Sequence, residues 1–223
     1  MKPLHLAALG LALATAPAIA EKVDWTKRTS LSTIGGYIQG NPDAKTRLVE
    51  YISYTCSHCA DFTNTAEAPL KVNWISKGTL NVEIRNAVRD RYDLTAALLA
   101  RCGGPTKFFG NHHALFANYD AWMKQVQAYD SKERPAATID TAMEDIASST
   151  GLYALMQKRG FTGAQLKACL ADRASREKVL AMTQDAWEGA KIGGTPSFAV
   201  NGRLLPDVHE WKALEAALPP ARN

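Results

Sequence analysis

The feature that most constrains the fold is the segment RLVEYISY at positions 47–54, which leads directly into a C-x-x-C sequence. This segment is rich in β-branched and aromatic residues and is nearly apolar throughout, which is typical of a central strand covered on both faces. The residues from Cys56 through Ala66 predict a helix that continues toward a kink near Pro69. A strand followed at once by a helix favours a sheet with helices packed against it.

The rest of the chain predicts the elements that complete such a sheet. Asn-Gly between two short apolar runs is the strongest short-range signal for a β-hairpin. The predicted fold class is α/β, with a mixed β-sheet flanked by helices and a long helical insert. The further elements are a short edge strand at 31–38, a strand at 80–88, helices within 92–190, a hairpin around Asn201-Gly202, and a last helix that Asp207 can cap and that runs through Leu218.

Residues 1–20 have the pattern of a secretory signal peptide. An apolar stretch is followed by Ala18-Ile19-Ala20, which supplies the small residues of a cleavage site, so that Glu21 would become the first residue. The alternative is a buried N-terminal helix, for which the break at Pro17 has no structural need. We therefore expect the protein to be exported.

Charge and composition exclude several classes of protein. The formal net charge is +4, and the Lys and Arg residues are scattered, so we expect no nucleic-acid partner. The hydrophobic residues make up 46% and the charged residues 22%, which is ordinary for a globular protein and unlike disordered, collagen-like or coiled-coil chains. After residue 20 there is no apolar run of about 18 residues, so we expect no membrane anchor.

Cys56-Ser57-His58-Cys59 lies where the predicted strand meets the predicted helix. Two sulfurs that are three residues apart in a first helical turn can meet and form a disulfide. The unpaired N–H groups and the helix dipole favour the thiolate of Cys56, and His58 can add to this effect if it donates to the sulfur or carries positive charge. The motif therefore predicts a redox-active disulfide between Cys56 and Cys59, without metal or cofactor.

Two other interpretations of the C-x-x-C stay open. It could be half of a zinc site, although no second pair of ligands with suitable spacing is present. It could also be an inert structural disulfide, which would not explain its position directly after a buried strand.

The segments VEYISYTCSHC and GGTPSFAVNG together resemble the DsbA-like branch of the thioredoxin superfamily. The resemblance extends in order and spacing over most of the chain after residue 20. It implies a thioredoxin-like domain made of residues 21–91 and 190–223, into which a helical domain of residues 92–189 is inserted. Ser57 departs from the proline of the best-known oxidases of the family, which leaves the oxidising strength open.

The resemblance also implies roles for three residues outside the C-x-x-C. Pro196 would follow a cis peptide bond beside the disulfide, so that the backbone of Thr195 can pair with a substrate strand, which agrees with the low cost of a cis X-Pro bond. A trans turn at the start of a strand is the alternative. Glu50 would be a buried acid that moves protons to and from Cys59, the alternative being an edge glutamate that reaches solvent.

Cys102 and Cys169 both lie in the helical insert and outside any C-x-x-C. They form either a structural disulfide or two buried thiols. His112 and His113 stand among aromatic and apolar residues, and we interpret them as packed or surface residues without a catalytic role.

The function expected from these residues is that of a periplasmic disulfide oxidase. Oxidised Cys56–Cys59 would accept a substrate thiolate at Cys56, and Cys59 would resolve the mixed disulfide. The expected partners are reduced, unfolded exported proteins and, from the family resemblance, a quinone-linked membrane protein that reoxidises the site. We expect a monomer, because residues 21–46 are too few for the separate N-terminal dimerisation domain of family isomerases.

Two rival functions remain open from the sequence. A disulfide isomerase or reductase would use the same chemistry in another direction. A non-enzymatic chaperone would bind copper through the two thiolates, or hold a peptide, although a metal carrier has no need of the Thr195-Pro196 motif.

Overall fold

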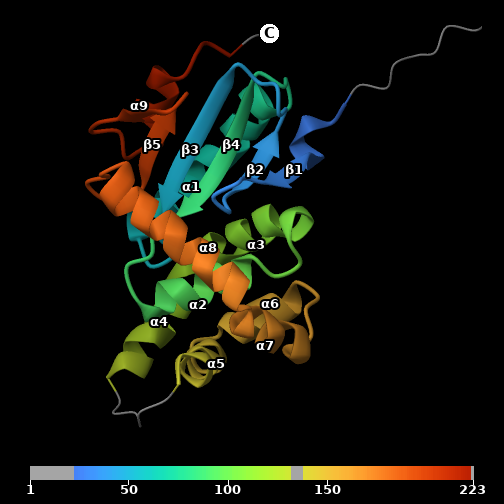
Figure 1. Ribbon diagram of the computed structural model, residues 1–223, viewed down its shortest axis with the longest axis vertical. Coiled ribbons are helices and arrows are strands. Elements are labelled where there is room, and N and C mark those ends of the chain that lie inside the picture. The colour runs from blue at the N-terminus through green and yellow to red at the C-terminus, as the bar shows by residue number, and fades with distance from the viewer. Residues whose placement is uncertain (1–22, 132–137, 222–223) are drawn as a thin grey trace, which may run out of the picture.

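The computed structural model describes residues 23–131 and 138–221 (Figure 1). A six-stranded sheet with the order β1-β2-β4-β3-β5-β6 forms its upper half as drawn. Strands β3 and β4 are parallel and the other neighbouring pairs are antiparallel, which confirms the predicted mixed sheet. The strands are Thr29–Leu31 (β1), Tyr37–Gly40 (β2), Thr46–Ile52 (β3), Leu80–Asn86 (β4), Ser197–Val200 (β5) and Arg203–Leu205 (β6).

The helices are distributed over both faces of the sheet and below it (Figure 1). The helical segments are Trp25–Lys27 (η1), Ser57–Leu70 (α1), Lys71–Ile75 (η2), Arg91–Ala100 (α2), Pro105–Ala117 (α3), Tyr119–Asp130 (α4), Ile139–Ser149 (α5), Leu152–Lys158 (α6), Gly163–Ala171 (α7), Arg173–Gln184 (α8), Asp185–Gly189 (η3) and Trp211–Ala217 (α9). Helices α1 and α8 continue into the short π-helical segments η2 and η3, and the 3-10 turn η1 precedes β1.

Strand β3 is central, with β4 on one edge and β5 on the other. Leu48 and Ile52 are fully buried in the main core, and Tyr51 packs on the opposite face in a smaller cluster with residues of η3. Figure 1 shows α1 behind the strands and α8 crossing in front of them. Coverage on both faces explains why residues 47–54 are nearly continuously apolar.

Helices α2 to α8 lie between β4 and β5 in the chain. Helices α2 to α7 pack below the carboxyl ends of β3 and β4, and α8 leads back across the front of the sheet (Figure 1). The main apolar core continues from the sheet into these helices, and the rings of Tyr37 and Phe108 stack 4.1 Å apart across the junction. The division of the chain at residues 92 and 189 stays a prediction.

Two predicted elements are wrong in detail. Residues 31–38 are not one strand, because the chain turns between β1 and β2 at Gly35, whose φ of 100° is unfavourable for residues with a side chain. Asp207 does not cap the last helix, since it has a φ of 59° and α9 begins only after Glu210. The predicted hairpin is confirmed, with Asn201 and Gly202 as the two-residue turn between β5 and β6.

The predicted signal segment, residues 1–20, lies outside the described residues. Across residues 23–131 and 138–221, none of the helices has the length and apolar character needed to cross a membrane.

Candidate active site

Cys56 and Cys59 lie at the start of α1, directly after the carboxyl end of β3. Cys56 is the extended N-cap residue of the helix, and Cys59 lies in its first turn. Both cysteines are free thiols in this structure. Cys56 keeps 4% of its surface exposed whereas Cys59 is fully buried, so a second molecule would meet the sulfur of Cys56 first.

The two thiols differ strongly in acidity. The pKa of Cys56 is lowered to about 5, mainly because the Cys59 thiol donates a hydrogen bond to it; the Thr195 side chain, the Cys59 backbone N–H and the charge of Arg89 add to the effect. Burial and the same hydrogen bond raise the pKa of Cys59 well above its ordinary value. Near neutral pH, Cys56 is therefore a thiolate and Cys59 a protonated donor.

The segment before β5 lies beside Cys56, as the pairing of the two sequence motifs predicts. The Thr195–Pro196 peptide bond is cis, which confirms that prediction. The Cys56 sulfur lies 3.1 Å from the Thr195 carbonyl oxygen, to which it donates a hydrogen bond when it is protonated. The Thr195 hydroxyl is buried without a hydrogen-bond partner among the described residues, so it is free to turn toward a thiolate.

The space next to this segment is open. A Cβ atom built on Gly193 or Gly194 would meet nothing within 4 Å. The carbonyl oxygen of Pro196 lies 2.7 Å from Nδ1 of His209, so it already has a polar partner. The backbone of Gly193 and Gly194, directly before Thr195, thus has open space beside it, where an extended chain could pair next to the reactive sulfur.

Glu50 lies on β3 with only 4% of its surface exposed, so the alternative of an edge glutamate that reaches solvent is wrong. Burial, with the charge of Glu67 as a smaller cause, raises the pKa of Glu50 to about 8. Its charge also contributes to raising the pKa of Cys59. An acid that titrates near neutral pH close to a buried thiol is suited to exchange a proton with it.

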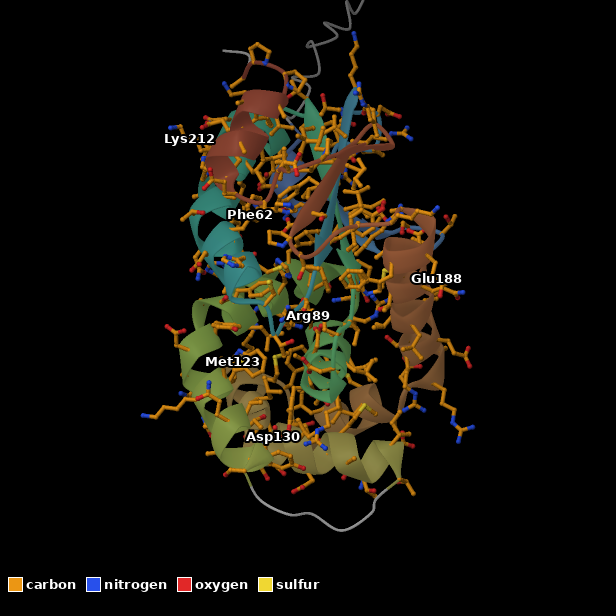
Figure 2. All side chains as sticks on the ribbon, turned by 90° about the vertical axis from the view of Figure 1, so that its left-hand side faces the viewer. Phe62, Arg89, Met123, Asp130, Glu188 and Lys212 are labelled. Carbon is orange, nitrogen blue, oxygen red and sulfur yellow. A yellow bond between two sulfur atoms is a disulfide. The ribbon has the colours of Figure 1, made fainter. Side chains whose placement is uncertain are left out.

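Arg89 is a site residue that the sequence analysis missed. Its side chain donates to the Thr55 carbonyl at 2.7 Å and to the Ser53 hydroxyl at 3.1 Å, which holds its charge beside the loop before Cys56. Figure 2 labels Arg89 at the level where the sheet meets the helices. A usable signal was present: parallel strands end at one edge of a sheet, so residues shortly after 80–88 should lie near residues 53–55.

Asp93 on α2 supports the same loop from below. It is fully buried and accepts hydrogen bonds from the backbone N–H groups of Tyr54, at 2.7 Å, and Arg89, at 3.1 Å. Burial raises its pKa to about 7, against the opposing effect of these hydrogen bonds and one from Ser53. Asp93 thereby fixes the ends of β3 and of the segment after β4 relative to each other.

His58 is exposed on α1, and Arg89 is the cation that contributes to lowering the pKa of Cys56. The predicted assistance from His58 stays a prediction. His112 is buried and its Nδ1 lies 3.0 Å from the Tyr54 hydroxyl, while the side chain of His113 is half exposed.

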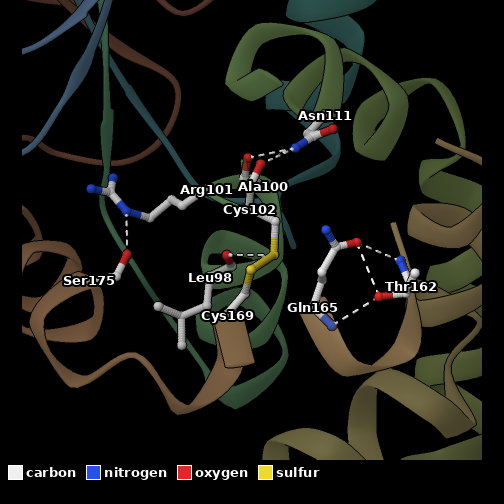
Figure 3. The surroundings of a disulfide bond; sticks show 9 residues. All are labelled: Leu98, Ala100, Arg101, Cys102, Asn111, Thr162, Gln165, Cys169 and Ser175. Carbon is white, nitrogen blue, oxygen red and sulfur yellow. Dashed lines mark hydrogen bonds between the residues drawn. A yellow bond between two sulfur atoms is a disulfide. The ribbon is translucent and has the colours of Figure 1, made fainter. Parts of the chain in front are cut away.

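Cys102 and Cys169 are joined in a disulfide between the end of α2 and α7 (Figure 3). Of the two interpretations left open by the sequence, the structure therefore contains the bonded one. Asn111 donates to the carbonyl oxygens of Ala100 and Cys102 and so provides hydrogen-bond partners for the backbone at the end of α2, next to this disulfide.

Known proteins share this fold and sequence pattern. The family model described as Thioredoxin matches residues 32–219. A crystal structure of a protein-disulfide isomerase from Novosphingobium aromaticivorans is 36% identical, with a TM-score of 0.75 over 81% of this chain and 93% of that one. Wolbachia pipientis alpha-DsbA1 is 21% identical, with a TM-score of 0.68 over 84% of this chain and 90% of its own, and so shares the fold.

A curated relative from Rickettsia bellii is 30% identical over 82% of this chain. The chain spans 63% of the length of that relative and about half the length of the other curated Rickettsia relatives it matches. The family match extends over most of the residues that build the sheet and the site, and the chain belongs to the thioredoxin family.

Proposed function

We propose that this protein is a thiol-disulfide oxidoreductase that introduces disulfides into exported proteins. The observation that carries the proposal is the asymmetry of the C-x-x-C pair, in which Cys56 is acidic and slightly exposed and Cys59 is buried and protonated. A stabilised thiolate in the reduced form makes the disulfide form a stronger oxidant.

In the proposed reaction, a substrate thiolate attacks the Cys56 sulfur of the oxidised pair. The Cys56–Cys59 bond breaks, a mixed disulfide forms at Cys56, and Cys59 leaves as a thiolate that takes a proton from Glu50. A second thiolate of the same substrate then attacks the substrate sulfur of the mixed disulfide, and Cys56 is the leaving group. The substrate leaves oxidised, and the protein is left with two reduced cysteines, Cys56 as a thiolate.

The open space beside Gly193 and Gly194, next to Thr195, supports an extended polypeptide as the substrate, held by main-chain hydrogen bonds beside Cys56. We place the reaction in the periplasm on the pattern of residues 1–20, with reduced, unfolded exported proteins as substrates. Turnover as an oxidase needs a partner that reoxidises the pair, for which a quinone-linked membrane protein is our proposal. We propose that the protein acts as a monomer.

The test is oxidation of a reduced dithiol peptide by the oxidised protein, compared with the Cys56→Ser variant. Wild type should form one peptide disulfide for each Cys56–Cys59 disulfide that is reduced, and Cys56→Ser should form none. No peptide oxidation by wild type would reject the proposal.

An isomerase is the second candidate, because the 36% identical structure carries that name. Reshuffling of a peptide with mispaired disulfides by the reduced protein separates the two functions: rapid reshuffling supports the isomerase, and its absence supports the oxidase. A reduction potential near that of cytosolic reductants would instead support a reductase.

A further inference from the structure

A small cavity lies between the sheet and α1. Its volume is about 40 Å³, and most of its lining is apolar, including Phe62, which is labelled in Figure 2. Its polar lining consists of Gln39, Glu50, Thr63, Glu67 and His112. The cavity thus joins the buried acid of the candidate site to a second acid on α1.

Two buried polar atoms at this cavity have no protein partner within residues 23–131 and 138–221. Oε1 of Glu50 and Oγ1 of Thr63 are buried and have no hydrogen-bond partner among the described residues. Oε2 of Glu67 is also buried, and it forms an ion pair of 2.5 Å with Nδ1 of His113 when that ring is protonated. Buried polar atoms are almost always satisfied by protein or by ordered water. A cavity of about 40 Å³ with several polar atoms in its wall has room for about two water molecules.

A path from the buried thiol toward the surface runs along one face of α1. Cys59, Thr63 and Glu67 are spaced by four residues and therefore lie on one face of α1. Cys59 is fully buried, whereas the side chain of Glu67 is 38% exposed and that of His113, on α3, is 50% exposed. Glu67 thus lies where the path reaches solvent.

We propose that Glu67 relays a proton between Glu50 and the protein surface, through water held in this cavity. Glu50 exchanges this proton with Cys59, so Glu67 acts on the thiol indirectly, as a positioning residue. This inference rests on the proposed function. When Cys59 leaves as a thiolate, it takes a proton from Glu50, and the Glu50 carboxylate is reprotonated from solvent by way of Glu67. When Cys59 attacks a mixed disulfide at Cys56, its proton travels the opposite way.

Four ionisable side chains face the cavity or its mouth: Glu50, Glu67, His112 and His113. Burial, with the charge of His113 as a smaller cause, lowers the pKa of His112 to about 3, so its ring is neutral near neutral pH. Its Nδ1 is already in contact with the Tyr54 hydroxyl. The path therefore runs through the two acids.

A purely electrostatic role of Glu67 predicts the opposite result from a relay. The charge of Glu67 helps to raise the pKa of Glu50, after the larger effect of burial. If Glu67 acted through its charge alone, Glu67→Gln would lower the pKa of Glu50, leave more carboxylate near neutral pH, and speed removal of the Cys59 proton. If Glu67 carries the proton, the same substitution slows that step.

The experiment follows the reaction of the reduced protein with glutathione disulfide by quenched flow and mass spectrometry. The first step attaches glutathione to Cys56, and the second, in which Cys59 attacks, releases it. Glu67→Gln should leave the first step unchanged and slow the second about tenfold, with a larger solvent isotope effect. Glu215→Gln is the matched control, because it removes an exposed carboxylate from α9, a helix packed against α1, and both steps should keep their wild-type rates.

A second step in Glu67→Gln that is as fast as in wild type or faster, or an equal loss in both steps, would overturn the relay. If Glu67→Gln does not fold, Thr63→Val replaces it, since this removes a polar atom from the cavity and keeps the shape of the side chain. A folded Thr63→Val protein with an unchanged second step would overturn the relay as well. Absence of the first step in wild type would instead reject the proposed function.

Discussion

The sulfur of Cys56 lies 3.1 Å from the carbonyl oxygen of Thr195, although the two residues are 139 positions apart in the chain. Strand β5 pairs with β3, and this pairing brings the start of β5 to the end of the strand that leads into α1. The reactive sulfur and an open stretch of backbone therefore face the same space.

The acidity of Cys56 gives the first prediction. Its pKa of about 5 means that the thiolate is present above that pH and is lost as the pH falls through it. The rate of alkylation of the reduced protein at Cys56 should therefore be half-maximal near pH 5. A midpoint near that of an ordinary cysteine, about 8.5, would contradict the described hydrogen bonding.

Arg89→Gln should make the pair a weaker oxidant. Loss of the positive charge beside the loop before Cys56 raises the pKa of this thiol and destabilises the reduced form. Because the Arg89 side chain is partly exposed and screened by solvent, we expect only about a threefold shift in the redox equilibrium with glutathione, and a smaller one at high salt.

The matched control for Arg89 is Arg91→Gln. Arg91 is exposed and pairs with Asp130 on α4, away from the C-x-x-C. The redox equilibrium of this variant should equal that of wild type, and an equal shift in both variants would mean that only the net charge matters.

Glu50 should make the reduced protein less stable as the pH rises. Its pKa is about 8 in the folded chain and about 4.5 when unfolded, so between these values the folded state holds a proton that the unfolded chain has released. Increasing pH therefore favours unfolding across this window. Glu50→Gln removes the effect, and its advantage over wild type in free energy of unfolding should grow by roughly 3 kcal/mol from pH 5 to pH 8.

The measurement is denaturant unfolding of both reduced proteins at several pH values. Cys56, whose lowered pKa gives the opposite slope, is present in both proteins and cancels in the difference. Asp93, whose raised pKa gives a slope of the same sign below pH 7, cancels likewise. A difference that is constant with pH would show that Glu50 does not titrate in this range.

Removal of the Cys102–Cys169 disulfide should affect stability and leave the chemistry intact. The bond closes a loop with a sequence separation of 67 residues in the helical part of the chain (Figure 3). The double variant Cys102→Ala, Cys169→Ala should lose about 4 kcal/mol of unfolding free energy by the chain-entropy relation. Peptide oxidation below its melting temperature should keep its rate, and a large loss there would mean that the bond positions the site.

Local sequence patterns were sufficient for the elements that hold the motifs. The apolar run before Cys56 predicted β3, and Asn201-Gly202 predicted the hairpin, because both signals depend on neighbouring residues. The edge hairpin of β1 and β2 was missed because its turn at Gly35 lies inside a run that resembles one strand.

The candidate site was predictable where it follows the two motifs and not where it depends on packing. The family resemblance predicted that Thr195 and Pro196 lie beside the cysteines. Arg89 lies in a segment without periodicity, and its position follows from the parallel register of β3 and β4. The side-chain oxygens of Glu50 and Thr63 that have no hydrogen-bond partner in the described part of the chain are buried only because α1 lies on the sheet, which the sequence does not show.

The central claim is that Cys56 is the sulfur that exchanges with a second molecule, and that Cys59 is its internal partner, which releases a glutathione bound to Cys56. It is tested most directly by mass spectrometry of the reduced Cys59→Ser variant after mixing with glutathione disulfide. We predict one glutathione per chain, attached to Cys56, which accumulates because no resolving thiol is present. An unmodified Cys56, or a Cys56→Ser variant that forms the adduct at Cys59 just as fast, would contradict the account.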